Sequence, residues 1–323
     1  MKRKLTVACT AVATLVLVAA LAGCGGGGSG SSSSGMKTIK LGVFPSGSLA
    51  PVYLAADKGI FAKHGLKVEF DTQNGGAALM PALNSGQLDF AFGSPISVLT
   101  ARAQGLDVHI ATGFNAEGPV SDMGADSSVV VAMPASGIKT TADLAGRRVS
   151  VNALGAAGEL GIREAVKKAG KDPNSIKFVE LGFQDVAAQL KSGAIDAGMV
   201  VPPFTQELEQ DGAKVISDFQ REAGISDAVL VTYSGSAAAK DPKELADFQA
   251  AMKDVVTYGT EHPEEVRQEM VKQFDFSPTL AKTIPLGKLT TQVPEQALQN
   301  FARLLYEYKV LPKEPDVAGV VLN

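Results

Sequence analysis

Two segments of this 323-residue chain repeat each other, and this repeat constrains the fold more than any other feature. Residues 83–95 read LNSGQLDFAFGSP and residues 190–202 read LKSGAIDAGMVVP, so Leu, Ser, Gly, Asp and Pro recur 107 positions apart. Each copy predicts a helix that ends at Ser, a left-handed Gly, a short apolar strand after Asp, and a Pro that ends the strand and suits the start of the next helix. We therefore expect one helix–turn–strand–helix unit twice, although SG turns are common in α/β proteins.

The segments around the two copies alternate between strand and helix patterns. Strands are expected at 39–44, 66–70, 88–92, 108–114, 128–133, 147–151, 176–181, 195–201, 213–216 and 229–233. The β-α-β-α-β-α-β order of the first four strands predicts a parallel sheet with helices on both faces. From Asp241 onward, four successive helical patterns are expected to cover a lobe rather than to build another sheet.

The first 35 residues have the pattern of a targeting segment followed by a tether. Residues 1–23 join a basic start to an apolar run and end in Leu-Ala-Gly before Cys24, which resembles the lipobox of bacterial lipoprotein signals. That resemblance implies lipid on Cys24 and the membrane as a partner; a plain signal peptide and an uncleaved anchor are the alternatives. Residues 24–35 are expected to be a flexible Gly/Ser tether. The other cysteine, Cys9, lies in the apolar run, so no disulfide is expected in the mature protein.

Charge and motifs argue against several classes of function. A net charge of −4 without a basic patch makes nucleic acid an unexpected partner. The three histidines, His64, His109 and His262, are not spaced with a second ligand, so no metal site is expected. No nucleophile-elbow, phosphate-loop or zinc-protease motif occurs, so we expect no catalytic residue and no cofactor. Asp89 and Asp196 precede the repeated strands and are interpreted as structural residues that either form the turn or accept N–H groups.

Loops at the carboxyl ends of the predicted strands form the candidate binding site. Ligands of open α/β sheets bind at this edge, and the helices that follow bring free N–H groups and positive dipole ends to it. Small polar side chains there suit a polar or anionic ligand, although the same residues are also ordinary turn formers. The candidate ligand-binding residues are Ser46, Gly47, Ser48, Asn74, Gly75, Gly76, Gly93, Ser94, Asn152, Gly155, Ala156, Phe183, Pro202 and Phe204.

Several segments resemble one known family. PVYLAADKGIFAKHGLKVEF, PALNSGQLDFAFGSP, DLAGRRVSV and AAQLKSGAIDAGMVVPPF are similar to the substrate-binding proteins of ABC importers of the nitrate/sulfonate/taurine type, over about residues 38–220. The resemblance implies an α/β, periplasmic-binding-protein type II fold with two lobes joined by two hinge crossings, near 112–114 and 229–232. Lobe 1 would comprise 36–115 plus 223–323, and lobe 2 would comprise 116–222.

The function that this resemblance implies is solute capture outside the cytoplasm, not catalysis. A membrane-anchored monomer would bind a small solute such as a sulfonate, taurine or nitrate between its lobes, and deliver it to an ABC permease with its ATPase. One departure is Val201, which replaces an acid that family members often carry before the Pro, and the loops offer no Arg to clamp an anion. A thiamine-precursor-like pyrimidine or another heteroaromatic solute is therefore an alternative. So is an enzyme on the same fold, of the pyrimidine or menaquinone synthesis type.

Overall fold

The computed structural model describes residues 35–73, 75–116, 128–202, 204–225, 228–274, 276–284 and 286–321. The chain separates into two units, Met1–Gly35 and Met36–Asn323, and every described helix and strand belongs to the second. The predicted signal peptide, Cys24 and the tether as far as residue 34 lie outside the described residues. Within the described ranges, no helix combines the length and apolar character that a membrane crossing requires.

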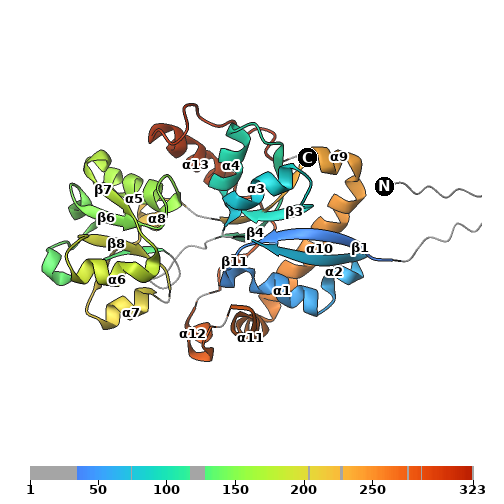
Figure 1. Cartoon of the computed structure of the whole chain (residues 1–323), viewed down its shortest axis with the longest axis horizontal. Helices are drawn as coiled ribbons and strands as arrows, with labels where there is room; N and C mark the ends of the chain where they lie inside the picture. The colour runs from blue at the N-terminus through green and yellow to red at the C-terminus, as the bar shows by residue number, and fades with distance from the viewer. Residues whose placement is uncertain are drawn as a thin grey trace, which may run out of the picture. The chain divides into compact units, whose positions relative to one another are not determined.

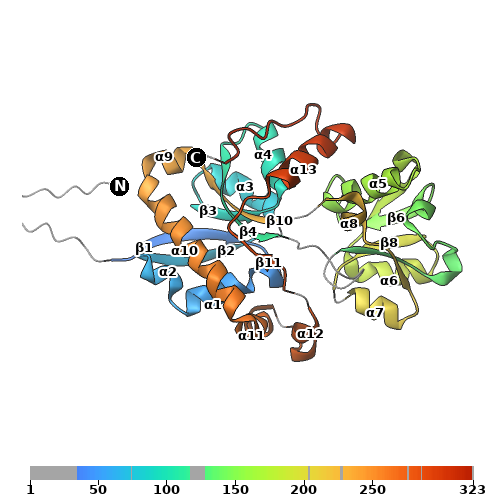
Figure 2. The same ribbon diagram turned by 180° about the vertical axis from the view of Figure 1, so that it is seen from behind.

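Six strands form the first sheet, in the order β11-β4-β10-β3-β1-β2; Figure 1 labels four of them, and Figure 2 labels β2 and β10 as well. Their bounds are β1 Lys37–Val43, β2 Leu66–Thr72, β3 Phe90–Gly93, β4 Val108–Ala116, β10 Ala228–Ser234 and β11 Lys288–Leu289. β1 pairs in parallel with β2 and β3, whereas β10 pairs antiparallel with both β3 and β4, and β11 pairs antiparallel with β4.

The expectation that the first sheet is parallel is wrong for the strands that pair with β10 and β11. β3 and β4 run in the same direction, but they are not neighbours, because β10 returns from later in the chain and lies antiparallel between them. Leu230 is thus opposite Gly93 on one side and Gly113 on the other. The segments proposed as hinges also meet here, since Val231 is paired with Thr112. A local periodicity carries no information about such long-range pairing.

The second sheet repeats the strand order of the first. Its order is β7-β6-β8-β5-β9, with β5 Val129–Ala132, β6 Arg148–Val151, β7 Lys177–Glu180, β8 Ala197–Val200 and β9 Lys214–Ser217. The series β7-β6-β8-β5-β9 corresponds position by position to β2-β1-β3-β10-β4, and in both the fourth strand is antiparallel to its neighbours. The two sheets therefore have the topology that duplication of one unit predicts. The chain passes between them twice, after β4 and after β9.

Helices cover both faces of each sheet. On the first sheet, α1, α2 and α10 bury their apolar residues on one face, and α3, α4 and α13 bury theirs on the other; Figure 2 shows α10 crossing its face. On the second sheet, α5 and α8 lie on one face, and α6 and α7 lie on the other. The α-helices are α1 Ala50–Asp57, α2 Ile60–Lys63, α3 Gly76–Asn84, α4 Pro95–Ala103, α5 Ala157–Lys168, α6 Phe183–Lys191, α7 Phe204–Gln210, α8 Phe219–Ala223, α9 Gly235–Lys240, α10 Pro242–Glu261, α11 Pro263–Phe274, α12 Pro278–Thr283 and α13 Glu295–Glu307. The short 3₁₀ helices are η1 Gly47–Leu49, η2 Pro134–Ser136, η3 Thr141–Leu144 and η4 Pro173–Ser175.

The two copies of the sequence repeat form the same turn, as predicted. Ser85 ends α3 and Ser192 ends α6, and each is followed by a left-handed glycine, Gly86 with φ 75° and Gly193 with φ 71°. Each Ser hydroxyl donates to the carbonyl oxygen three residues earlier, at 3.0 Å and 3.1 Å. The four helical patterns expected after residue 241 are also confirmed, as α10 to α13.

The copies differ where the strand meets the next helix. Pro95 occupies the first position of α4, as the pattern predicts. Pro202 stands in a turn instead, and α7 begins at Phe204. The prolines therefore end the strand in both copies, but only the first begins a helix.

Candidate functional site

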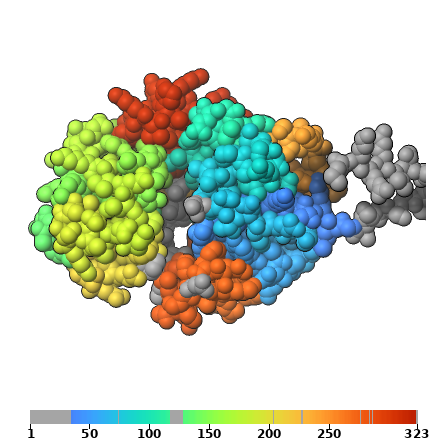
Figure 3. Space-filling model, viewed as in Figure 1, coloured from blue at the N-terminus to red at the C-terminus, as the bar shows by residue number. Residues whose placement is uncertain are grey.

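A pocket of about 750 Å³ opens at the carboxyl ends of β1 and β3. The surface is hollowed beside α11 and α12, which are orange in the space-filling view (Figure 3). The polar residues that line it are Ser46, Ser48, Ser94, Asn115, Thr260 and Lys288. The larger apolar residues that line it are Phe44, Val201, Val229, Val266, Met270, Phe276, Ile284, Leu286 and Leu289. A pocket thus lies at the predicted edge of the sheet, but the residues that line it are mainly apolar.

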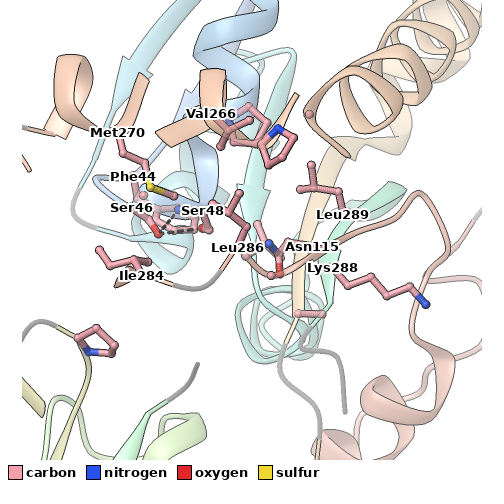
Figure 4. A pocket seen from close by; sticks show the side chains of 18 of the residues that line it. Phe44, Ser46, Ser48, Asn115, Val266, Met270, Ile284, Leu286, Lys288 and Leu289 are labelled. Carbon is pink, nitrogen blue, oxygen red and sulfur yellow. Dashed lines mark hydrogen bonds between the residues drawn. The ribbon is translucent and has the colours of Figure 1, made fainter. Parts of the chain in front are cut away.

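The loop after β1 brings two serine hydroxyls to the pocket. Ser46 caps the short helix η1 because its Oγ accepts a hydrogen bond from Ser48 N at 3.3 Å. The two hydroxyls are themselves 2.8 Å apart, and the close-up view shows this contact (Figure 4). Gly47 between them lies against Phe276, because a Cβ at Gly47 would be 3.0 Å from the Phe276 ring. The serines therefore stand directly beside the apolar wall.

The loop after β3 places Ser94 at the start of α4. Ser94 Oγ accepts from Ser97 N at 3.3 Å, and Ser97 Oγ accepts from Ser94 N at 2.7 Å, which makes a reciprocal capping box. Gly93 is held close to α3, because a Cβ on Gly76 would lie 2.8 Å from the Gly93 Cα. The glycine predicted at 76 thus serves the close approach of α3 to β3.

Asn115 of β4 contributes the pocket's amide group. It is 9% exposed, and it is paired with Val229 of β10 on one side and Leu289 of β11 on the other, both of which line the pocket. Its side chain lines the pocket, so its amide can be reached from there. Asn115 was not among the predicted site residues, since nothing in the sequence distinguishes it from any polar residue near a strand end.

The apolar wall was also missed by the sequence analysis. Met270 comes from α11, and Phe276, Ile284 and Leu286 come from the segments on either side of α12. These helices were assigned only to covering a lobe. A signal was the pair of apolar residues at 276 and 286, which lie outside the expected helical patterns and which a purely solvent-facing loop would not carry.

The structure brings six of the predicted site residues together in the pocket: Ser46, Gly47, Ser48, Gly93, Ser94 and Pro202. Gly75 and Gly76 stand at the start of α3 behind β3 and do not line it. Asn74 lies outside the described residues. The remaining predicted residues belong to the second sheet and are not part of the pocket lining: Asn152, Gly155, Ala156, Phe183 and Phe204.

The predicted amides of the loop after β6 are already in use. Gly155 N donates to Glu159 Oε2 at 2.8 Å, and Leu154 N donates to Glu180 Oε2 at 3.0 Å. Glu159 is in turn paired with Arg163 at 2.7 Å. Carboxylates of the protein therefore occupy N–H groups of this loop, including that of Gly155, which was predicted to bind a ligand.

Phe183 and Phe204 meet elsewhere on the second sheet. Their ring centroids are 6.2 Å apart, and they line a separate pocket of about 90 Å³ with Leu208 and Asp211. That volume is close to what a few water molecules need and is far smaller than the pocket at the ends of β1 and β3.

None of the described lining residues of the large pocket is a His, Cys, Asp or Glu. The three histidines lie elsewhere: His64 contacts Asp254 at 2.8 Å, His109 contacts Asp107 at 2.9 Å, and His262 contacts the Tyr258 carbonyl oxygen at 2.9 Å. The serine hydroxyls consequently have no general base beside them among the described lining residues.

Two sheets of one topology, with a pocket at the strand ends, define the periplasmic-binding-protein class of fold. The periplasmic aliphatic sulphonate binding protein SsuA of Escherichia coli has this fold with a TM-score of 0.72, at 19% identity over 89% of this chain and 92% of that one. The alkanesulfonate-binding protein SsuA of Xanthomonas axonopodis pv. citri, bound to MOPS, gives a TM-score of 0.69 at 18% identity, covering 89% and 99%. These likenesses confirm the predicted fold class.

The sequence model of the family described as NMT1/THI5 like matches residues 46–266. The chain belongs to this family.

Curated relatives of this chain include both binding proteins and enzymes. A protein of Brucella abortus named as a binding protein is 24% identical over 66% of this chain, and the match spans 63% of that relative's length. A protein of Brachyspira hyodysenteriae named as an ABC transporter periplasmic binding protein is 25% identical over 56% of this chain and 53% of its own. A 4-amino-5-hydroxymethyl-2-methylpyrimidine phosphate synthase of Aspergillus parasiticus is 25% identical over 73% of this chain and 69% of its own.

Proposed function

We propose that this protein is an extracytoplasmic solute-binding protein that delivers a small molecule to an ABC importer. The observation that carries the proposal is the 750 Å³ pocket at the carboxyl ends of β1 and β3, to which the second copy of the repeat adds Val201 and Pro202. Pockets of this size hold small molecules, and strand ends are where open α/β folds bind them. The partners would be an ABC permease and its ATPase, and the protein would act as a monomer.

Binding without catalysis is favoured over the activity of the synthase relatives. The described lining of the pocket offers hydroxyls, one amide and one amine, but no carboxylate or imidazole for proton transfer. A synthase needs groups that move protons or activate a co-substrate. Detection of turnover of a bound compound by the purified protein would support the enzyme alternative instead.

The membrane anchor is proposed from the sequence of residues 1–24. Lipid on Cys24, followed by the Gly/Ser stretch to residue 35, would hold the binding unit at the outer side of the cell membrane. A Cys24→Ser variant is expected to lose lipid labelling while the binding unit keeps its melting temperature. Acylation that persists in this variant would contradict the proposed anchor.

Two ligand chemistries follow from the sequence and the relatives. The first is a polar or anionic solute such as a sulfonate, taurine or nitrate, which the names of the two similar structures support. The second is a neutral heteroaromatic such as a thiamine-precursor pyrimidine, which the name of the synthase relative supports. Either would be held between groups of the first sheet and the end of β8.

A thermal-shift screen over these classes tests the proposal. We expect one class to raise the melting temperature of the wild type, because a ligand that binds only the folded state stabilises it. A Ser48→Trp variant, which fills the pocket beside Ser46, should lose the response. Ser192→Trp, at an exposed turn of the second sheet, is the matched control and should keep it. A screen in which no solute shifts the wild type would count against solute binding.

A further inference from the structure

The lining of the pocket offers little positive charge to a small anion. Lys288 is the one ionisable side chain among its described lining residues. Figure 4 shows the Lys288 side chain extending away from Ser46 and Ser48, and Lys288 is exposed. An anion enclosed among apolar side chains without a paired cation pays a large desolvation penalty. The pocket as built therefore disfavours nitrate, taurine or a sulfonate head.

Backbone amides in two of the predicted loops are already engaged. At the start of α4, Ser94 N and Ser97 N are bonded to each other's hydroxyl oxygens. At the β6 loop of the second sheet, the Leu154 and Gly155 amides are bonded to Glu180 and Glu159. An anion at these amides would have to displace the acceptors, two of which are carboxylates that would repel it. These two loops are therefore poor places for an anion.

A neutral polar side chain lines the pocket. Asn115 is nine-tenths buried, and Figure 4 shows its amide at the pocket beside Leu286. A ligand with matching groups would hydrogen bond to this amide in place of water. Because a carboxamide presents one acceptor and two donors, its complement is a group that has both a donor and an acceptor.

The chain also leaves room for this amide. Gly287 adjoins Asn115 so closely that a Cβ there would lie 2.5 Å from its Oδ1 and 2.6 Å from its Nδ2. Gly287 does not have a positive φ, so its lack of a side chain is explained by this contact rather than by backbone conformation. The apolar wall of Met270, Phe276 and Ile284 stands across the same pocket.

We propose that the ligand is an uncharged molecule with an apolar body and a donor–acceptor head, and that Asn115 is the residue that selects the head. The inference rests on the proposed solute-binding function. The head group is of the amide, lactam or amino-heterocycle kind, and it bonds to Asn115 with the serine hydroxyls nearby. The body packs on the side chains of α11 and of the segments flanking α12.

Three probes that differ only in their heads test this proposal by calorimetry on the purified protein: 4-butylbenzamide, 4-butylbenzoate and 4-butylbenzenesulfonate. We expect the amide to bind about tenfold tighter than either anion, the ratio that one well-made polar contact supplies. Lys282→Gln, on α12 outside the pocket lining, is the control and should leave the affinity for the amide within about twofold, because an exposed lysine contributes little to binding a neutral head. Gly287→Ala should weaken amide binding by pushing Asn115 aside.

A change of specificity separates selection by Asn115 from a structural role. Asn115→Asp keeps the shape but adds a carboxylate, so it should lose affinity for the benzamide and gain affinity for 4-butylbenzamidine, a cation of the same shape. A gain of binding cannot arise from a damaged fold. Equal weakening of all probes by this variant would overturn the role of Asn115.

The remaining outcomes distinguish this inference from the proposed function. Tighter binding of the sulfonate or benzoate than of the amide, with loss of that binding in Lys288→Gln, would overturn the neutral head and leave solute binding intact. So would a melting-temperature response to nitrate or taurine when none of the three probes binds. A protein that responds to no solute at all would contradict the proposed function, and this inference with it.

Discussion

Asp196 accepts a hydrogen bond from the backbone N–H of Arg148 at 2.8 Å, and its other carboxylate oxygen is paired with the Arg148 guanidinium, also at 2.8 Å. The equivalent residue of the first sheet, Asp89, accepts from Lys40 N at 2.7 Å. Each aspartate thus ties the start of the strand it precedes to the neighbouring strand. The motif is structural in both copies, as its position in the sequence predicts, and an ion pair has been added in the second copy.

We expect Asp196→Asn to reduce stability at neutral pH but not in acid. The hydrogen bond from Arg148 holds the pKa of the Asp196 carboxyl below its usual range. A lowered pKa stabilises the folded state above the ordinary carboxyl pKa of about 3.9, and this contribution is lost as pH falls through the lower folded value. The variant should lose about 1–2 kcal/mol at pH 7, a figure discounted for partial exposure.

Urea unfolding of the wild type and Asp196→Asn between pH 2 and 7 measures this difference. The two curves should converge as pH falls below the ordinary carboxyl range. Asp89→Asn is the matched comparison, because it removes the same charge at a site where the described residues give it no arginine partner, and it keeps an oxygen that can accept from Lys40 N. A wild-type advantage that grows toward acid would contradict the argument.

Loss of either serine of the Ser94–Ser97 capping box should cost about 1 kcal/mol of stability, the usual cost of losing a helix cap. We expect Ser94→Ala and Ser97→Ala to lower the free energy of unfolding by that amount. The double variant should lose less than the sum, because the two residues satisfy each other's amide. Strict additivity in denaturant unfolding would show that the two caps act independently.

Replacing Gly113 should be among the most damaging single changes in β4. A Cβ there would lie 2.1 Å from the carbonyl oxygen of Gln292, which is backbone and cannot rotate away. Gly113→Ala should therefore separate residues 290–292 from the sheet and cost about 3 kcal/mol, the upper part of the range for overpacking. Gly35→Ala, which would meet nothing within 4 Å, is the control for calorimetric melting. Equal melting temperatures for the two variants would contradict this view of the β4 edge.

We expect the free energy of unfolding to fall less steeply with rising pH in Tyr308→Phe than in the wild type. Burial, and then the negative charge of Glu164, raise the pKa of Tyr308, whose hydroxyl donates to Glu164 at 3.4 Å. When folding raises the pKa of a phenol, the folded state becomes less stable as pH rises above the ordinary phenol pKa of about 10. The reason is that only the unfolded chain then releases the proton. Unfolding between pH 8 and 11 should show a shallower decline in Tyr308→Phe. Tyr306→Phe, 51% exposed, should follow the wild type.

The sequence predicted well what depends on neighbouring residues. The turns at Gly86 and Gly193 follow from a helix end and a glycine, so their φ values and hydrogen bonds agree with the pattern. The serines at 46, 48 and 94 stand at strand ends next to helix starts, and the structure places them in one pocket. Each of these features is decided within a few residues of chain.

What depends on distant residues could not be predicted in the same way. The position of β10 between β3 and β4 joins Leu230 to Gly93 and Gly113, and no local period encodes that choice. Asn115 acquires its place in the pocket only because β10 and β11 flank it. The amide of Gly155 looked free in the sequence, yet Glu159, four residues later, turns back to accept from it.

Because β10 comes late in the chain, the two sheets are completed in a fixed order during synthesis. The second sheet is made of one continuous stretch, from Val129 to Ser217, so its strands can pair as soon as that stretch has emerged. The first sheet must wait, with the facing edges of β3 and β4 unpaired, until β10 has been made. Unpaired edges invite association with other chains. The sheet begun first is therefore completed last, and a nascent chain that stalls before Ala228 would carry a completed second sheet together with a first sheet whose open edges are prone to aggregation.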